Sequence, residues 1–214
     1  RPLAVRTDIP EAIKRLPYWV GFHGMTEDAM VSIEHLLDSI GVPAAVHLYH
    51  WHEIDFDTHY PDFWPPRDVT FEYVKRLHAR GALVMPYTNQ HLMDEASASW
   101  VPDHASAYVA MAPGGRASTE SWSAGPGVKL HPMCPATYYW QGKFDDLAVR
   151  LVRDLDVDGI YCDQVACVPP DLCFDPTHGH PLGGGNHWWA GHSRQIAAMR
   201  QAAATAKKGI FFTS

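Results

Sequence analysis

The sequence is poor in positive charge and contains no long hydrophobic run. Its 17 Lys and Arg are outnumbered by 24 Asp and Glu, so the formal net charge is −7, and no run of Lys and Arg exceeds two residues. A nucleic acid or an anionic membrane surface is therefore not an expected partner. No apolar run reaches the roughly 18 residues of a membrane-spanning helix, so no membrane span is expected either.

Cysteine is also scarce, with Cys134, Cys162, Cys167 and Cys173 as the only four. They form no C-x-x-C pair and match none of the usual zinc spacings. We therefore expect no disulfide framework, no structural zinc and no cofactor. Cys162 fits best as a small buried side chain.

The sequence does contain a regular alternation of short apolar runs and amphipathic segments. Its 46% hydrophobic residues suffice for the core of one sizeable domain. Short β-rich runs predict strands, and apolar residues at helical spacing predict helices. The expected strands are residues 18–22, 44–51, 82–87, 158–163 and 210–213. The expected helices lie at about residues 26–40, 71–80, 137–155 and 196–206.

Strands that alternate with helices form a parallel sheet covered by those helices. A dinucleotide-binding open sheet would carry Gly-x-Gly-x-x-Gly after its first strand, and this sequence lacks it. The long loops follow strands rather than helices, as in (β/α)8 TIM barrels. Five strands do not close such a barrel. We therefore expect an α/β fold that is a partial TIM barrel, with the remaining strands C-terminal to Ser214.

The domain organisation follows from the same alternation. Residues 1–17 are interrupted by proline and form a lead-in segment, and residues 18–214 form the N-terminal part of the barrel domain. Periodicity fails at about residues 94–131, which we interpret as a loop insertion. Paired strands are expected there at 107–111 and 128–130, around the turn at Gly114 and Gly115.

Asp163 is the main candidate for a catalytic residue. Strand alternation places Tyr161 and Asp163 on one face and Ile160 and Cys162 on the other. Asp163 would then end its strand at the barrel mouth, where barrel enzymes carry their active sites. A carboxylate there can act as a nucleophile or an acid/base. The alternative is an Asp that only caps the next loop.

Aromatic and polar residues near other strand ends are candidate substrate contacts. Trp51 and Trp188 adjoin suspected loops and could present apolar faces to sugar C–H groups, although packing of the barrel mouth is the alternative for any Trp. Tyr87 and Asn89 share one strand face and could bind sugar hydroxyls, or could serve interior packing.

A histidine-rich loop follows Asp163, with His178, His180, His187 and His192 near Asp175. Imidazole and carboxylate groups are common zinc ligands, so a metal site is one interpretation. However, the His-Gly-His segment is not a helix-face pair, and three following glycines suit close approach of the backbone to a ligand. Hydrogen bonding of His178 and His180 to sugar hydroxyls is therefore preferred, with loop architecture as the other alternative, and no metal is expected.

Four segments together resemble a known group of proteins. Residues 57–65, 86–89, 159–164 and 178–188 resemble a group of glycoside-hydrolase-like barrels that is distantly similar to the alpha-galactosidase and endo-alpha-N-acetylgalactosaminidase superfamilies. In those superfamilies the nucleophile is an Asp at the end of the fourth strand, a position that Asp163 occupies here. Their proton donor follows strand five or six, which the resemblance places beyond Ser214.

The resulting hypothesis is a retaining glycoside hydrolase with Asp163 as nucleophile and an oligosaccharide or glycoside as substrate. Retention needs a second carboxyl group at about 5 Å, whereas inversion needs about 6.5–9.5 Å. Gln164 or Tyr161 could donate a hydrogen bond that keeps Asp163 ionised, and Gln164 is a candidate substrate contact. The alternatives are a metal-dependent hydrolase that uses the histidine-rich loop and a non-catalytic carbohydrate-binding barrel.

Overall fold

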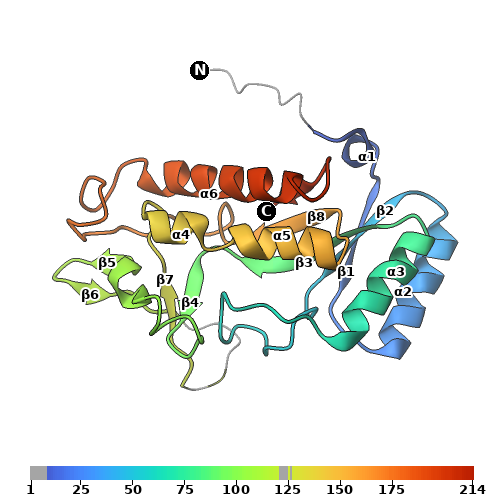
Figure 1. The fold of residues 1–214 in the computed structure, drawn as a ribbon, viewed down its shortest axis with the longest axis horizontal. Coiled ribbons are helices and arrows are strands. Elements are labelled where there is room, and N and C mark those ends of the chain that lie inside the picture. Colours follow the sequence, from blue (N-terminus) through green and yellow to red (C-terminus); the bar gives the residue numbers. More distant parts are fainter. Residues whose placement is uncertain (1–8, 121–124, 126) are drawn as a thin grey trace.

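The chain folds around a five-stranded parallel sheet with the strand order β1-β2-β3-β8-β9 (Figure 1). The computed structural model describes residues 9–120, 125 and 127–214. Neighbouring strands of this sheet run parallel, and their order in space follows their order along the chain. The strands are β1 (Tyr18–Phe22), β2 (Ala44–Leu48), β3 (Leu83–Asn89), β8 (Gly159–Asp163) and β9 (Phe211–Thr213).

One short helix precedes the first strand of the sheet, and the other helices lie between its strands along the chain. They are α1 (Glu11–Lys14), α2 (Glu27–Ile40), α3 (Asp68–Ala79), α4 (Tyr138–Gly142), α5 (Asp145–Asp154) and α6 (His187–Ala204). The Thr26 side chain accepts a backbone hydrogen bond at the start of α2, and Gly41 ends this helix in the left-handed conformation. Arg76 of α3 binds Glu34 of α2, and the two helices lie side by side in Figure 1. No helix in the described part of the chain is long and apolar enough to cross a membrane.

The fourth strand of the sheet, β8, shows the predicted alternation. Ile160 and Cys162 are buried in the main hydrophobic core, whereas Tyr161 and Asp163 are only partly buried. The prediction that Tyr161 and Asp163 share a face is confirmed, because the Tyr161 hydroxyl lies 3.4 Å from Asp163 Oδ1. Cys162 is a buried thiol, as expected.

Three predicted element boundaries differ in the structure. The helix expected at residues 137–155 is two helices, α4 and α5, because the chain turns between Gly142 and Asp145 to bury Phe144. The second strand ends at Leu48 rather than residue 51. Helix α6 begins at His187, well before the apolar spacing that starts at Ile196, because buried polar residues occupy its first turns.

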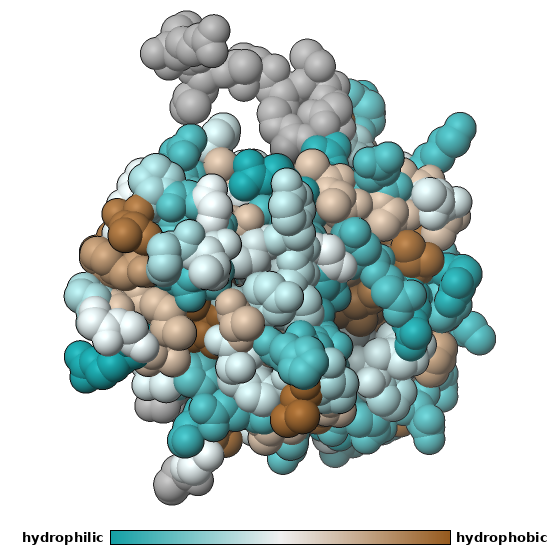
Figure 2. All heavy atoms as spheres, turned by 60° about the vertical axis from the view of Figure 1, so that its left-hand side comes forward, coloured by the Kyte–Doolittle hydropathy of each residue, from teal (hydrophilic) through white to brown (hydrophobic). Residues whose placement is uncertain are grey.

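The segment expected to be an insertion contains two small antiparallel sheets. β4 (Leu92–Asp94) pairs with β7 (Leu130–Pro132), and β5 (Met111–Ala112) pairs with β6 (Arg116–Ala117) around the predicted glycine turn. The expected pairing of 107–111 with 128–130 is wrong, since a 3-10 helix, Ala105–Tyr108, occupies part of the first segment. Residues 121–124 and 126 of the predicted insertion lie outside the described part. Figure 2, which brings this end of the molecule forward, shows a largely hydrophilic face with separate apolar groups.

The sheet is strongly curved. The rings of Trp19 on β1 and Phe211 on β9 lie 5.9 Å apart, although β2, β3 and β8 separate these strands in the sheet. Phe211 lies directly over Gly159, where an added Cβ would be 2.4 Å from its ring. Among the described residues β1 and β9 each pair with one strand only, so the structure shows an open parallel sheet and no closed barrel.

Candidate active site

Asp163 stands at the carboxyl end of β8 with two hydroxyl groups directed at its carboxylate. The Tyr87 hydroxyl donates to Oδ2 at 3.0 Å, and the Tyr161 hydroxyl lies 3.4 Å from Oδ1. The strand register explains this meeting, because Tyr87 pairs with Tyr161 and Asn89 pairs with Asp163 across β3 and β8. The partly exposed carboxylate can therefore act as an oriented nucleophile or as an electrostatic partner of a bound molecule.

Buried groups fix the position of the Tyr87 hydroxyl. Asn89 Nδ2 donates to it at 3.3 Å, while Asn89 Oδ1 accepts the backbone amides of His91 and Leu92, each at 2.9 Å. Burial raises the pKa of Tyr87 far above its usual value and raises the pKa of Tyr161 to about 12. Both phenols thus keep their protons and stay hydrogen-bond donors at neutral pH.

An aromatic wall lines the sheet beside Asp163. The His47 ring lies 4.3 Å from the Tyr161 ring and 4.1 Å from the Tyr49 ring, centroid to centroid. Burial lowers the pKa of His47 to about 4, so its imidazole is neutral near pH 7. Its Nε2 atom is buried and has no hydrogen-bond partner in the described part of the chain.

Several predicted substrate contacts are packed inside the protein instead. Trp51 is fully buried, and its indole N–H donates to the Tyr87 carbonyl at 2.8 Å, so its faces are closed to a ligand. Trp188 is 6% exposed, and its ring packs on the edge of His91. Both tryptophans therefore pack inside the protein, which is the alternative role considered for them in the sequence. Asn89 is also fully buried, and its side-chain amide donates a hydrogen bond to the Tyr87 hydroxyl.

Gln164 follows Asp163 but turns away from its carboxylate. Its backbone adopts a φ of 62°, and its buried side chain lies 3.1 Å from His91 Nδ1. The expectation that Gln164 hydrogen-bonds to Asp163 is therefore wrong, while the expectation for Tyr161 holds. The opposite side of the His91 ring binds Asp171 at 2.6 Å, which connects this part of the site to the following loop.

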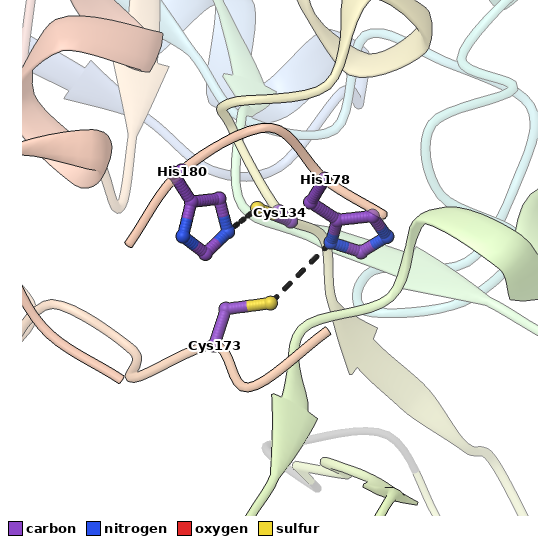
Figure 3. Close-up of side chains that lie close together, drawn as sticks. All are labelled: Cys134, Cys173, His178 and His180. Carbon is purple, nitrogen blue, oxygen red and sulfur yellow. Dashed lines mark hydrogen bonds between the residues drawn. The ribbon is translucent and has the colours of Figure 1, made fainter. Parts of the chain in front are cut away.

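His178 and His180 do not meet Asp163 through any contact in the described structure. They contact two cysteines instead: His178 Nδ1 lies 3.3 Å from Cys173 Sγ, and His180 Nε2 lies 3.3 Å from Cys134 Sγ (Figure 3). These two imidazoles therefore face sulfur atoms inside the protein. Cys173 lies five residues before His178 on the same loop, whereas Cys134 lies 46 residues before His180.

Sequence reasoning missed three residues next to Asp163. His47 lies on β2, and Tyr49 directly follows the last residue of that strand, Leu48. Cys167 lies on the loop after β8, with its exposed Sγ 3.6 Å from Asp163 Oδ1. The alternation of side chains along a strand could have identified His47 and Tyr49, because residues two apart on a strand point to the same face.

Comparison with known proteins places the chain in a family. A family model described as "Domain of unknown function (DUF6259)" matches residues 3–214. The chain belongs to the DUF6259 family. Because the match covers most of the chain, the curved sheet and the Asp163 site both lie within the DUF6259 domain.

Curated relatives of the DUF6259 chain carry glycoside hydrolase names. It is 28% identical over 192 residues to a Bacteroides thetaiotaomicron protein named "Putative glycoside hydrolase", a match that covers 90% of this chain and 28% of that protein. It is 34% identical over 173 residues to "Putative glycoside hydrolase 22789" of Monosiga brevicollis, a match that covers 73% of this chain and 14% of that protein. The chain thus spans less than a third of either relative.

Solved glycosidase structures share the fold. The alpha-N-acetylgalactosaminidase NagBb of Bifidobacterium bifidum aligns with a TM-score of 0.66 at 14% identity, over 97% of this chain and 38% of that one. The alpha-galactosidase TtGalA of Thermus thermophilus aligns with a TM-score of 0.57 at 16% identity, over 96% of this chain and 41% of TtGalA. At these identities the likeness establishes the fold, an α/β arrangement with a parallel sheet. The predicted resemblance to glycoside-hydrolase-like proteins is confirmed.

Proposed function

We propose that this DUF6259 chain is the N-terminal part of a retaining glycoside hydrolase in which Asp163 is the nucleophile. The observation that supports this most directly is the Asp163 carboxylate at the end of β8, which accepts hydrogen bonds from two phenol hydroxyls. The names of the relatives and the folds of the structural neighbours support the same reaction class. An oligosaccharide or glycoside is the proposed substrate.

The architecture that suits this reaction is a TIM barrel of which residues 18–214 form the first five strands. Support comes from the sequential strand order and from the curvature that brings Trp19 near Phe211. In this proposal residues 1–17 lead into the barrel, and the segment at about 94–131 is an insertion at the carboxyl end of β3. The remaining strands lie beyond residue 214 and pair with the open edges of β1 and β9.

The proposed reaction has two steps. An Asp163 oxygen attacks the anomeric carbon while the bond from that carbon to the leaving oxygen breaks, and a carboxylic acid beyond residue 214 gives that oxygen a proton. The resulting carboxylate then takes a proton from water, whose oxygen attacks the anomeric carbon and releases Asp163. Hydrogen bonds from Tyr87 and Tyr161 orient the nucleophile before attack.

The remaining polar residues divide into substrate contacts and positioning residues. Tyr49, which is partly exposed beside the His47 ring, is a proposed contact for sugar hydroxyls. Asn89 is a positioning residue for Tyr87. Gln164 and Trp188 are buried around His91, so their proposed role is to support the loop after β8.

The test is Asp163→Asn in the full-length protein, assayed with a panel of aryl α- and β-glycosides. The amide cannot attack the anomeric carbon, so we expect turnover to fall by about 1,000-fold or more with unchanged circular dichroism. Asp146→Asn on α5 is the matched control, since Asp146 is exposed and lies on a different element. Wild-type turnover by Asp163→Asn would remove Asp163 as the nucleophile.

The stereochemical part of the proposal has its own readout. A retaining enzyme releases a product with the anomeric configuration of the substrate, which proton NMR of the early product detects. In Asp163→Gly, added azide should restore turnover by attacking from the side of the missing carboxylate. Inverted product from the wild-type enzyme would contradict the nucleophile assignment.

A further inference from the structure

Two cysteines and two histidines lie close together in the structure (Figure 3). Cys134 follows β7, whereas Cys173, His178 and His180 lie on the loop between β8 and α6. One ligand atom of each residue lies within 4.8 Å of the other three. Cys134, Cys173 and His178 are buried, and His180 is partly exposed. A buried Cys2His2 set of this kind has the donor composition of a structural zinc site.

The spacing of the donor atoms fits a tetrahedral ion. Zinc lies about 2.3 Å from thiolate sulfur and about 2.0–2.1 Å from imidazole nitrogen, so sulfur and nitrogen ligands of one ion are about 3.6 Å apart. The two sulfur–nitrogen distances in the structure are both 3.3 Å. These two distances are a few tenths of an ångström shorter than the tetrahedral value.

Both imidazoles already turn the correct nitrogen toward the centre. His178 Nε2 lies 2.8 Å from the Ala107 carbonyl oxygen, and His180 Nδ1 lies 2.8 Å from the Pro181 carbonyl oxygen. A carbonyl oxygen can only accept, so each of these nitrogens carries the proton of a neutral ring. The inward nitrogens, His178 Nδ1 and His180 Nε2, therefore have a free lone pair. Backbone carbonyls hold metal-binding histidines in the same way.

The sulfur atoms also receive backbone hydrogen bonds. The amide of Ala136 interacts with Cys134, and the amide of Asp175 interacts with Cys173, so each cysteine is approached by the amide two residues later. Met111 supplies a further amide to Cys173. Backbone amides in such positions can donate hydrogen bonds to metal-bound sulfur atoms. Zinc with two thiolates and two neutral imidazoles carries no net charge, which lowers the cost of its burial.

We propose that Cys134, Cys173, His178 and His180 bind one zinc ion that holds the loop after β8 against the β7 segment. Binding displaces the two thiol protons, and the four protein ligands fill the tetrahedron. The filled shell leaves no position for a reacting water, so the ion is structural rather than catalytic. The expectation of no zinc rested on the spacing of cysteines along the chain, and the proposal departs from it because the fold brings Cys134 to the loop that carries the other three residues.

The metal would also support the candidate active site at a distance. Asp171, two residues before Cys173, binds His91, which in turn contacts Gln164 beside Asp163. A metal that holds Cys173 in place would therefore also hold Asp171, the first residue in this series of contacts. Zinc binding itself does not depend on the proposed glycosidase activity, because it uses none of the residues that surround the Asp163 carboxylate.

The first experiment measures metal content in the purified full-length protein by plasma mass spectrometry after dialysis against metal-free buffer. We expect about one zinc per chain more in the wild type than in a Cys134→Ala, Cys173→Ala variant. Cys167→Ser and His35→Ala are matched controls that keep wild-type zinc, since both residues are exposed and outside the cluster. Equal zinc in the wild type and the double variant would overturn the proposal.

A second measurement avoids variants that could fail to fold. Zinc X-ray absorption of the wild-type protein should show two sulfur and two nitrogen neighbours, and exchange for cobalt(II) should give the intense visible absorption of a tetrahedral thiolate site. Coordination by oxygen and nitrogen alone would contradict the assignment. Thiol titration under non-reducing denaturing conditions should find free Cys134 and Cys173; a disulfide between them would also overturn the proposal.

Discussion

At the scale of single residues, the Asp163 carboxylate is defined by the hydroxyls around it. Tyr87 makes the shorter contact at 3.0 Å, and Tyr161 makes the longer one at 3.4 Å. Hydrogen bonds to a charged group contribute about 1.5–3 kcal/mol, and the contribution weakens with distance. The two tyrosines should therefore differ in their effect on a reaction that uses this carboxylate.

Tyr87→Phe should lower kcat by about 10- to 100-fold, because it removes the stronger hydrogen bond to Asp163. Tyr161→Phe should have a smaller effect, and Tyr138→Phe should have none, since Tyr138 is 92% exposed. Steady-state kinetics on the best substrate from the glycoside panel checks the order. A larger loss in Tyr161→Phe than in Tyr87→Phe would contradict the assigned geometry.

At the scale of elements, helix α6 is seated against the segment that carries Cys134. A Cβ added to Gly191 of α6 would lie 2.2 Å from the Pro135 carbonyl oxygen, a backbone atom that cannot move alone. The Gln195 side chain of the same helix donates to the Trp140 carbonyl of α4 at 2.9 Å. The close approach at Gly191 is therefore part of how α4, α6 and the Cys2His2 cluster fit together.

Gly191→Ala should destabilise the protein by about 1–3 kcal/mol, because the new methyl group forces α6 away from Pro135. Gly142→Ala is the matched helical control. Its Cβ would meet no atom within 4 Å, so we expect unchanged or slightly higher stability. Urea denaturation of both variants measures the difference, and equal midpoints would argue against this packing of α6.

At the scale of the whole molecule, the buried histidines His47, His52 and His192 share a lowered pKa. Burial lowers the pKa of His47, His52 and His192 from 6.5 to about 4 in each case. The Nε2 atom of each is buried without a partner in the described part of the chain. A proton added there would place a charge with no acceptor inside the protein.

The free energy of unfolding should consequently fall as the pH falls from about 6.5 to about 4. In this window the unfolded chain binds protons on these histidines and the folded protein does not. Each histidine accounts for up to about 3 kcal/mol. Urea denaturation at several pH values measures the slope. His52→Asn should make the pH dependence of the unfolding free energy shallower, whereas His35→Asn, at an exposed position, should leave it unchanged. A wild-type unfolding free energy that does not change between pH 6.5 and 4 would contradict the assigned histidine pKa values.

The sequence by itself determined the order of the main strands and helices, and the face of β8 that carries Asp163. These features depend on local periodicity and on capping residues such as Thr26 and Gly41, which act within a few residues. Local periodicity was sufficient to predict that Asp163 lies at the end of a strand. Local patterns failed where a helix breaks to bury Phe144 and where small antiparallel sheets form.

Tertiary structure alone decided which side chains surround Asp163 and which groups face the histidine loop. Tyr87 reaches Asp163 through the pairing of β3 with β8, and Trp51 is closed off by packing that its neighbours in sequence do not reveal. Cys134 meets His180 only because the chain folds back between β7 and α6. Contacts between residues far apart in sequence depend on strand register and packing, which no short segment encodes.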